Sequence, residues 1–342
     1  MSDDCPKCQE SRELGANYCS GCGRFLGQEP FTEKPKAGLL ELVLIVAALF
    51  ITVLIIVEAI IMLFNFSDVY SFLSDKMFDL FVIVPYPQSI FTITDALPAY
   101  WALLVLIIVV CIFAALYEFV VKTKNFKDIT GQGVVENTAL FWIAVSFCAS
   151  TLITTVIVLI TLSTGTDINT PDLGDQLGQL FSFANAAVWE EIVSRLLYIG
   201  LPMLIITRLV FKKKGGFDCL IGGFGMSKAA IFFIVISSII FGFAHSTLWE
   251  GQSWKIIEVA ISGLFFGYIF VRFGLYASIL MHFVNDYLSS IAFYNGGFEV
   301  IVFLIIVLLG FLALAYVLIR LSKSKESFIS LPLFKNDYLK NT

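Results

Sequence analysis

Charged residues are scarce in this sequence. Asp, Glu, Lys and Arg make up only 14% of its 342 residues, whereas ordinary soluble proteins carry about 25%. Hydrophobic residues reach 58% and the mean hydropathy is +0.88. A chain this apolar cannot cover itself with a wetted surface, which excludes a soluble globular protein and a disordered one. With 22 basic against 27 acidic residues, the chain also lacks the basic excess of a nucleic-acid-binding protein.

The apolar residues are gathered in long windows. About 20 residues cross the hydrocarbon core as a helix, and eight windows reach that length, at 38–64, 99–120, 138–163, 180–211, 228–245, 254–271, 275–293 and 298–321. Polar or Gly- and Pro-containing segments separate them. The sequence therefore predicts an all-α polytopic membrane protein with about eight transmembrane helices, occupying residues 38–321, followed by a tail at 322–342.

Basic residues predict the orientation, because Lys and Arg of short loops stay on the cytoplasmic side. If the N-terminus is cytoplasmic, almost all basic residues outside the spans share that side, and only Lys76 and Lys255 fall outside. The external loops are instead acidic, at Asp68, Asp75, Asp79, Asp167, Asp172, Asp175 and Glu250. We therefore expect a multi-pass cell-membrane protein with both termini in the cytoplasm and lipids as its surroundings.

The N-terminal segment has a separate pattern. Two C-x-x-C pairs, Cys5 and Cys8 followed by Cys19 and Cys22, lie in a segment too short to build its own core. Four thiolates at this spacing are typical of a closed tetrahedral zinc site, which is structural rather than catalytic. The sequence predicts a zinc ribbon at residues 1–26, a linker at 27–37 and, from the position of the ribbon alone, a soluble partner for it.

Ionisable residues inside a span are costly and by default mark function. The fourth window contains Glu190, Glu191 and Arg195, and the only two histidines of the chain, His245 and His282, lie in later windows. Asp286 follows His282 by four residues, so the two share a helix face. By the same spacing Glu191 can pair with Arg195, which leaves Glu190 available. A carboxylate and two imidazoles can activate a water molecule and stabilise an oxyanion.

These elements, Glu-Glu-x-x-x-Arg, Phe-x-x-x-His and His-x-x-x-Asp on successive helices, resemble the signature of the CPBP family. This family includes CAAX prenyl proteases and bacteriocin-processing proteins, also called abortive-infection proteins. The resemblance covers roughly residues 138–293. It implies an intramembrane endopeptidase acting on a membrane-associated protein or peptide, such as a prenylated protein, a bacteriocin leader or a signalling-peptide precursor.

The resemblance also implies a role for each residue. Glu190 is the expected activator of water and His245 its partner, while His282 and Asp286 polarise the scissile carbonyl. Glu191 and Arg195 are expected to hold the helix in register. Many relatives have Asn where this chain has Asp286. Since an ionised Asp cannot donate to an oxyanion, Asp286 is either protonated, or orients His282, or binds a metal.

Two alternatives stay open at this point. The first concerns a catalytic zinc, for which Glu190, His245 and His282 are suitable ligands, although the sequence lacks the His-Glu-x-x-His helix of other intramembrane metalloproteases. The second concerns activity, since the same residues suit an inactive CPBP-type scaffold or regulator, or a proton-coupled transporter. The absence of visible inverted repeats disfavours the transporter.

Overall fold

The computed structural model describes residues 38–83, 87–124, 134–168, 174–209, 216–248 and 252–323, together with Lys7. The predicted zinc ribbon with Cys5, Cys8, Cys19 and Cys22, the linker and nearly all of the C-terminal tail lie outside the described residues. The described part of the chain is 83% helical. The prediction of a helical polytopic membrane protein is therefore confirmed.

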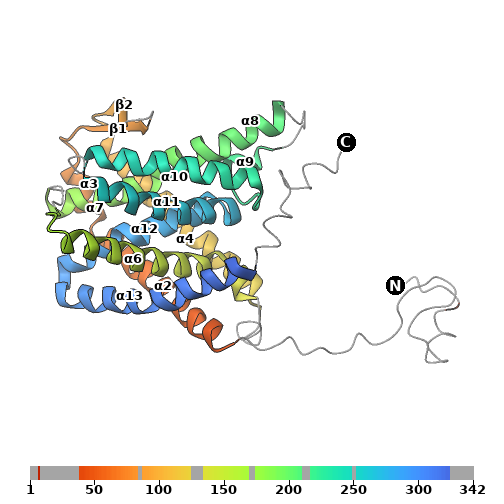
Figure 1. Ribbon diagram of the computed structural model, residues 1–342. Coiled ribbons are helices and arrows are strands. Elements are labelled where there is room, and N and C mark those ends of the chain that lie inside the picture. Colours follow the sequence, from red (N-terminus) through yellow and green to blue (C-terminus); the bar gives the residue numbers. More distant parts are fainter. Residues whose placement is uncertain are drawn as a thin grey trace.

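The long helices lie side by side in one bundle (Figure 1). The helical elements in chain order are α2 (Leu39–Phe64), α3 (Phe66–Phe72), α4 (Leu97–Lys122), η1 (Val135–Asn137), α6 (Ala139–Ser163), α7 (Gln176–Asn185), η2 (Ala186–Glu190), η3 (Ile192–Gly200), α8 (Leu201–Leu209), α9 (Asp218–Ile221), α10 (Lys228–Leu248), α11 (Ser253–Phe273), α12 (Leu275–Tyr287), η4 (Leu288–Ile291) and α13 (Ala292–Lys323). Helix α6 is the most enclosed, since every side chain from Ala139 to Ser150 is buried, and it packs against α2, α11 and α13.

Seven helical segments in the described part of the chain are long and apolar enough to cross a membrane, against eight predicted. The difference lies in the last segment, Leu275–Ser322, which is 48 residues long and covers two of the predicted spans. At 1.5 Å per residue a straight helix of that length would far exceed the hydrocarbon core of about 30 Å. It is interrupted at Asn295, whose φ of −158° and ψ of 96° are not helical.

Two glycines allow α10 and α11 to pack closely. Helix α11 carries Gly263 and Gly267 one turn apart, and a Cβ atom at these positions would lie 3.1 Å from Ser238 and 2.9 Å from Ile234 of α10. A G-x-x-x-G pair of this kind is typical of closely packed helices in a membrane. The contact matters for the site, because α10 carries His245 and α11 packs in turn against α12, which carries His282.

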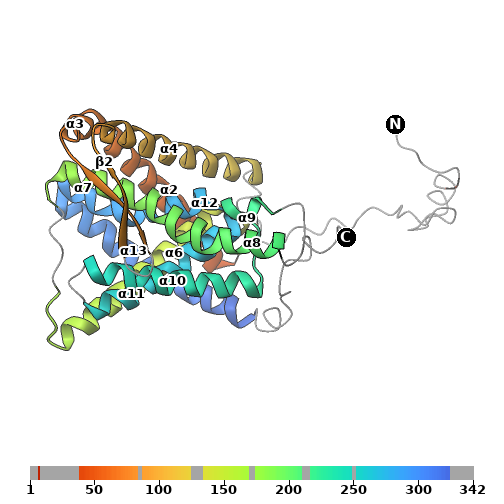
Figure 2. The same cartoon turned by 90° about the horizontal axis from the view of Figure 1, so that it is seen from above.

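A β-hairpin interrupts the helical pattern, and the sequence analysis did not predict it. Strand β1 (Phe78–Ile83) pairs antiparallel with β2 (Pro87–Ile93), with an irregular register between Leu80 and Phe81. The hairpin extends from the α3 end across the outside of the bundle towards α10 (Figure 2), and β1 contacts both η3 and α10. It therefore covers the space between two helices that carry predicted site residues.

The two ends of the bundle differ in charge. Helices α4, α8 and α11 end on the side where residues 38 and 323 lie, and their last turns carry Lys122, Arg208 and Arg272 (Figure 1). The hairpin and α3 lie at the opposite end, and these segments carry Asp68 and Asp79. Retention of Lys and Arg on the cytoplasmic side of the membrane would produce this distribution of charge.

Candidate active site

Glu190 lies on a helix that changes its winding. From Gln176 to Leu209 the chain is one continuous helical segment, and its N-terminus is capped by the Asp175 carboxylate, which accepts a hydrogen bond of 2.7 Å from the Gly178 amide. From Ala186 onward the helix is wound as a π-helix, first in η2 and then in η3. π-Helical turns are rare and are frequent at functional sites. Here η2 contains Glu190, η3 contains Arg195, and Glu191 lies between the two segments.

Glu191 and Arg195 form a fully buried ion pair. Arg195 Nε lies 3.1 Å from Glu191 Oε2, and neither side chain is exposed. Arg195 Nη1 also donates to Ser237 Oγ of α10 at 3.0 Å, and the guanidinium lies over the Phe241 and Phe266 rings, at 5.0 and 5.6 Å from their centroids. The arginine thus joins η3 to both α10 and α11, the register-holding position that the resemblance implied.

Glu191 has a further contact that the sequence analysis did not predict. Its Oε1 lies 3.1 Å from His282 Nδ1, and its Oε2 accepts a hydrogen bond from Ser278 Oγ on the same helix, α12. The Phe266 ring is stacked on the His282 imidazole at 4.9 Å. His282 is therefore fixed by a carboxylate at one nitrogen and by an aromatic ring on its face.

Four predicted site residues come together from three helices. Glu190 Oε2 lies 3.5 Å from His245 Nε2 and 3.9 Å from His282 Nε2. His282 Nε2 lies 3.4 Å from Asp286 Oδ2, whose partner oxygen accepts a hydrogen bond of 3.0 Å from Asn285. These residues are distant in sequence but adjacent in space.

His245 has a defined orientation. Its Nδ1 lies 3.0 Å from the Phe241 carbonyl oxygen, and the Phe241 ring meets the imidazole edge-on at 4.6 Å. Because a carbonyl only accepts, Nδ1 carries the proton, and the Nε2 of a neutral His245 is an acceptor that faces Glu190. Glu190 Oε2 is itself buried and has no hydrogen-bond partner among the described residues. With His245 neutral, two acceptors therefore face each other at 3.5 Å, whereas a protonated His245 would donate from Nε2 to Glu190.

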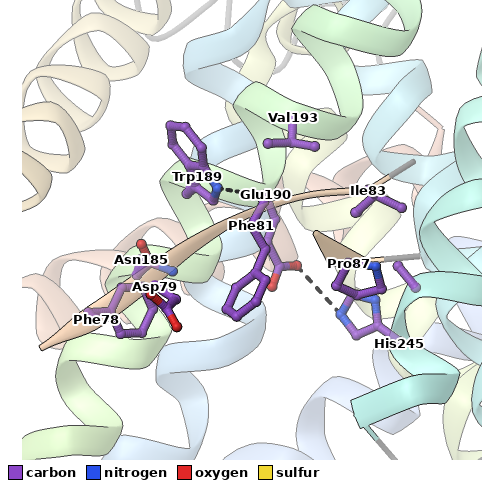
Figure 3. A pocket seen from close by; sticks show the side chains of 11 residues that line it. Phe78, Asp79, Phe81, Ile83, Pro87, Asn185, Trp189, Glu190, Val193 and His245 are labelled. Carbon is purple, nitrogen blue, oxygen red and sulfur yellow. Dashed lines mark hydrogen bonds and ion pairs between the residues drawn. The ribbon is translucent and has the colours of Figure 1, made fainter. Parts of the chain in front are cut away.

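A cavity of about 110 Å³ opens beside these two groups (Figure 3). Glu190 and His245 form one side of it, and the hairpin forms the other. The lining is otherwise mostly apolar and consists of Phe78, Asp79, Phe81, Ile83, Pro87, Asn185, Trp189, Val193 and Ala244. Concave apolar pockets with a few convergent polar groups are typical of binding and active sites.

Trp189, Asn185 and the hairpin were not singled out from the sequence. Trp189 Nε1 donates a hydrogen bond of 2.8 Å to the Phe81 carbonyl oxygen, and Asn185 Oδ1 accepts one of 2.8 Å from the Tyr100 hydroxyl. The position of Trp189 next to Glu190 was a usable signal. So was the run of aromatic and β-branched residues between 78 and 93 with prolines at its centre, which is typical of a hairpin.

A catalytic zinc needs three protein side chains arranged as ligands. No group of three or more His, Cys, Asp or Glu side chains within the described ranges is arranged to hold a metal ion. His282 already has a carboxylate at each nitrogen. A zinc ion bound by Glu190, His245 and His282 therefore stays a prediction without structural support. The ribbon cysteines lie outside the described residues.

The fold and the site together define a multi-pass membrane protein with a carboxylate and imidazole centre inside its helical bundle. Residues 176–288 match the family model described as Rce1-like, type II CAAX prenyl endopeptidase Rce1-like. The matched segment contains Glu190, His245, His282 and Asp286. None of the curated proteins and none of the solved structures compared with the chain matches it. The family match supports the CAAX-protease resemblance found in the motifs and implies a peptidase.

Proposed function

We propose that this protein is an intramembrane endopeptidase in which Glu190 and His245 activate a water molecule. The observation that carries the proposal is the buried Glu190 Oε2, which has no hydrogen-bond partner among the described residues and faces His245 Nε2 at 3.5 Å. Two facing acceptors are compatible with a donor held by both, and water supplies two donors. A buried acceptor left without a partner would otherwise cost about 1–3 kcal/mol.

In the proposed reaction the oxygen of this water attacks the carbonyl carbon of the scissile peptide bond while Glu190 takes up its proton. The carbonyl π electrons move to oxygen and form an oxyanion. The proton then passes to the amide nitrogen, the C–N bond breaks, and the products are a carboxylic acid and an amine. His245 holds the water through Nε2, and the Phe241 carbonyl fixes the ring that does so. General base catalysis of this kind typically contributes 10²- to 10⁴-fold.

We propose that His282 stabilises the oxyanion through the positive charge of its imidazolium, because both of its N–H groups already face carboxylates. Its two ring nitrogens lie 3.1 and 3.4 Å from the carboxylates of Glu191 and Asp286, and an imidazole can donate to both sides only when both nitrogens carry protons. The stacked Phe266 ring and the Glu191 bond keep it in place. In this proposal Asp286, which accepts from Asn285, orients His282 rather than touching the oxyanion itself.

We further propose that both termini are cytoplasmic and that the hairpin end of the bundle faces the other side. The basic helix ends lie with residues 38 and 323, and the hairpin lies opposite (Figure 1). Replacing Gln88 of β2 by Cys should give a residue that a membrane-impermeant maleimide labels on intact cells. A Cys replacing Lys122 should be labelled only after the membrane is opened. The reverse pattern would refute this orientation.

The proposal is tested by replacing Glu190 with Gln, which keeps the shape of the side chain and removes the base. Membrane peptides are compared by mass spectrometry in cells that carry the wild type, Glu190→Gln or a control, Glu118→Gln. Glu118 is a partly exposed glutamate near the end of α4, and its carboxylate accepts a hydrogen bond from the Ala139 amide. We expect a set of peptides that is lost only with Glu190→Gln. An unchanged set of peptides would refute the proposed enzymatic function and favour the inactive scaffold.

A further inference from the structure

The hairpin forms one wall of the cavity beside Glu190 and His245. The role that we propose for it rests on the proposed peptidase function. Strand β1 contributes Phe78, Asp79, Phe81 and Ile83 to the wall of the cavity that Glu190 and His245 face (Figure 3). It contacts both η3 and α10. A peptide whose scissile bond reaches Glu190 through this cavity therefore lies against β1.

One edge of β1 points towards η2 rather than towards β2. The Phe81 carbonyl is bonded to Trp189 on η2, so at this residue the backbone faces away from the partner strand. In an antiparallel pair the backbone groups of alternate residues point to the same edge. Asp79 and Ile83 therefore share the edge of Phe81. Ile83 lies opposite Pro87, which has no N–H, so this pair cannot exchange both bonds of the ladder.

The backbone groups on this edge are in part still available. Within the described ranges, neither Asp79 nor Ile83 forms a backbone hydrogen bond to any element outside the hairpin. Trp189 precedes Glu190 in the chain and fixes Phe81 at 2.8 Å, which places the edge beside the catalytic carboxylate. The edge is thus anchored to the same helical turn that carries the proposed base.

An intramembrane peptidase needs such an edge for a physical reason. A helix hides its peptide bonds, so the segment around the scissile bond must be extended before water can attack it. Extended backbone in a lipid environment leaves N–H and C=O groups unsatisfied, at several kcal/mol each. Addition of the segment as a strand to a sheet edge restores these bonds and leaves alternate side chains in pockets.

We propose that β1 is the docking strand of the substrate. The segment around the scissile bond pairs with the β1 edge formed by Asp79, Phe81 and Ile83, and one apolar side chain occupies the cavity. The volume of about 110 Å³ is far below the roughly 300–1,000 Å³ of pockets that enclose whole small-molecule ligands. The substrate class is therefore an extended peptide recognised through its backbone and one apolar side chain.

The test uses the full-length wild type in detergent micelles and a mixture of unmodified quenched fluorescent decapeptides. One decapeptide that the protein cleaves is then remade as a series, in which each peptide bond within four residues of the cut is N-methylated in turn. Strand addition predicts a rise in KM of about 5- to 10-fold at every second position, where the N–H is lost to β1, and little change between them.

The outcomes are distinct. A cleaved decapeptide with the period-two pattern supports docking on β1. A cleaved decapeptide whose KM responds without alternation, or not at all, overturns the docking strand and leaves the peptidase intact. If only prenylated versions of the peptides are cleaved, the claim that the backbone and one side chain suffice is wrong. If the wild type cleaves none of these peptides, the proposed function fails and the docking strand with it.

Discussion

Replacing Arg195 by Met should destabilise the protein strongly, because the buried Glu191 carboxylate loses its arginine. Among the described residues it then keeps only Ser278 and His282 as partners. Both side chains have no exposed surface and their charged groups lie 3.1 Å apart. Breaking a buried pair by removing one partner typically costs 3–5 kcal/mol. The Ser237 bond and the contacts with the Phe241 and Phe266 rings are lost as well, but Ser237 keeps its own acceptor, the Ser194 carbonyl at 2.6 Å. We therefore expect a loss of about 3–5 kcal/mol, dominated by the buried carboxylate that has lost its arginine.

The double variant separates the charge from the packing. In Arg195→Met with Glu191→Gln both charges of the pair are removed and His282 keeps Asp286 as its charged partner, so we expect recovery to within about 1–2 kcal/mol of the wild type. The free energy of unfolding is measured by titration of detergent micelles with sodium dodecyl sulfate. Arg272→Met is the control, since Arg272 also lies over an aromatic ring, Trp142 at 4.6 Å, but is partly exposed. A loss below 1 kcal/mol for Arg195→Met, or a double variant no more stable than the single one, would refute the reasoning.

Three further predictions follow from the site and the N-terminus. Asp286→Asn should keep the hydrogen-bonding shape beside His282 but lower kcat about 10-fold by loss of charge, and an unchanged kcat would contradict the orienting role. Trp189→Phe should raise KM several-fold with a smaller change in kcat, because the hydrogen bond to the Phe81 carbonyl is lost. The control Trp254→Phe should change neither constant. Equal effects of the two substitutions would refute the anchoring role of Trp189. The purified full-length protein should contain one zinc per chain by elemental analysis. Replacing Cys5 and Cys8 by Ser should remove this zinc while peptidase activity persists. Loss of activity along with the metal would contradict a purely structural zinc.

The helical architecture could be predicted because a membrane leaves few options for the backbone. Apolar windows of about 20 residues are read directly from the sequence, and helices were found over all of them. The count differed only in the last segment, Leu275–Ser322, which covers two predicted windows because the helix continues on both sides of the kink at Asn295. The polar residues were equally visible, since a charge inside an apolar window is rare and costly.

The remaining features depend on contacts between distant segments. The i,i+4 rule paired Glu191 with Arg195, but it could not show that Glu191 also reaches His282, which is 91 residues away in sequence. The π-helical winding around Glu190 lies where η2 packs against α12 and η3 packs against α10, and no local sequence pattern was available to predict it. The sequence predicted only a separating segment between two spans here, because prolines and aspartates are typical of loops. Its position over the cavity is a tertiary contact, made through Trp189.

The central claim is that Glu190 acts as the base for water in a peptidase. It is tested most directly by the rate at which purified protein cleaves the unmodified decapeptide mixture, compared between the wild type and Glu190→Gln at equal folded concentration. We predict cleavage by the wild type and a fall in kcat of at least about 100-fold in the variant. A variant that cleaves as fast as the wild type would contradict the account.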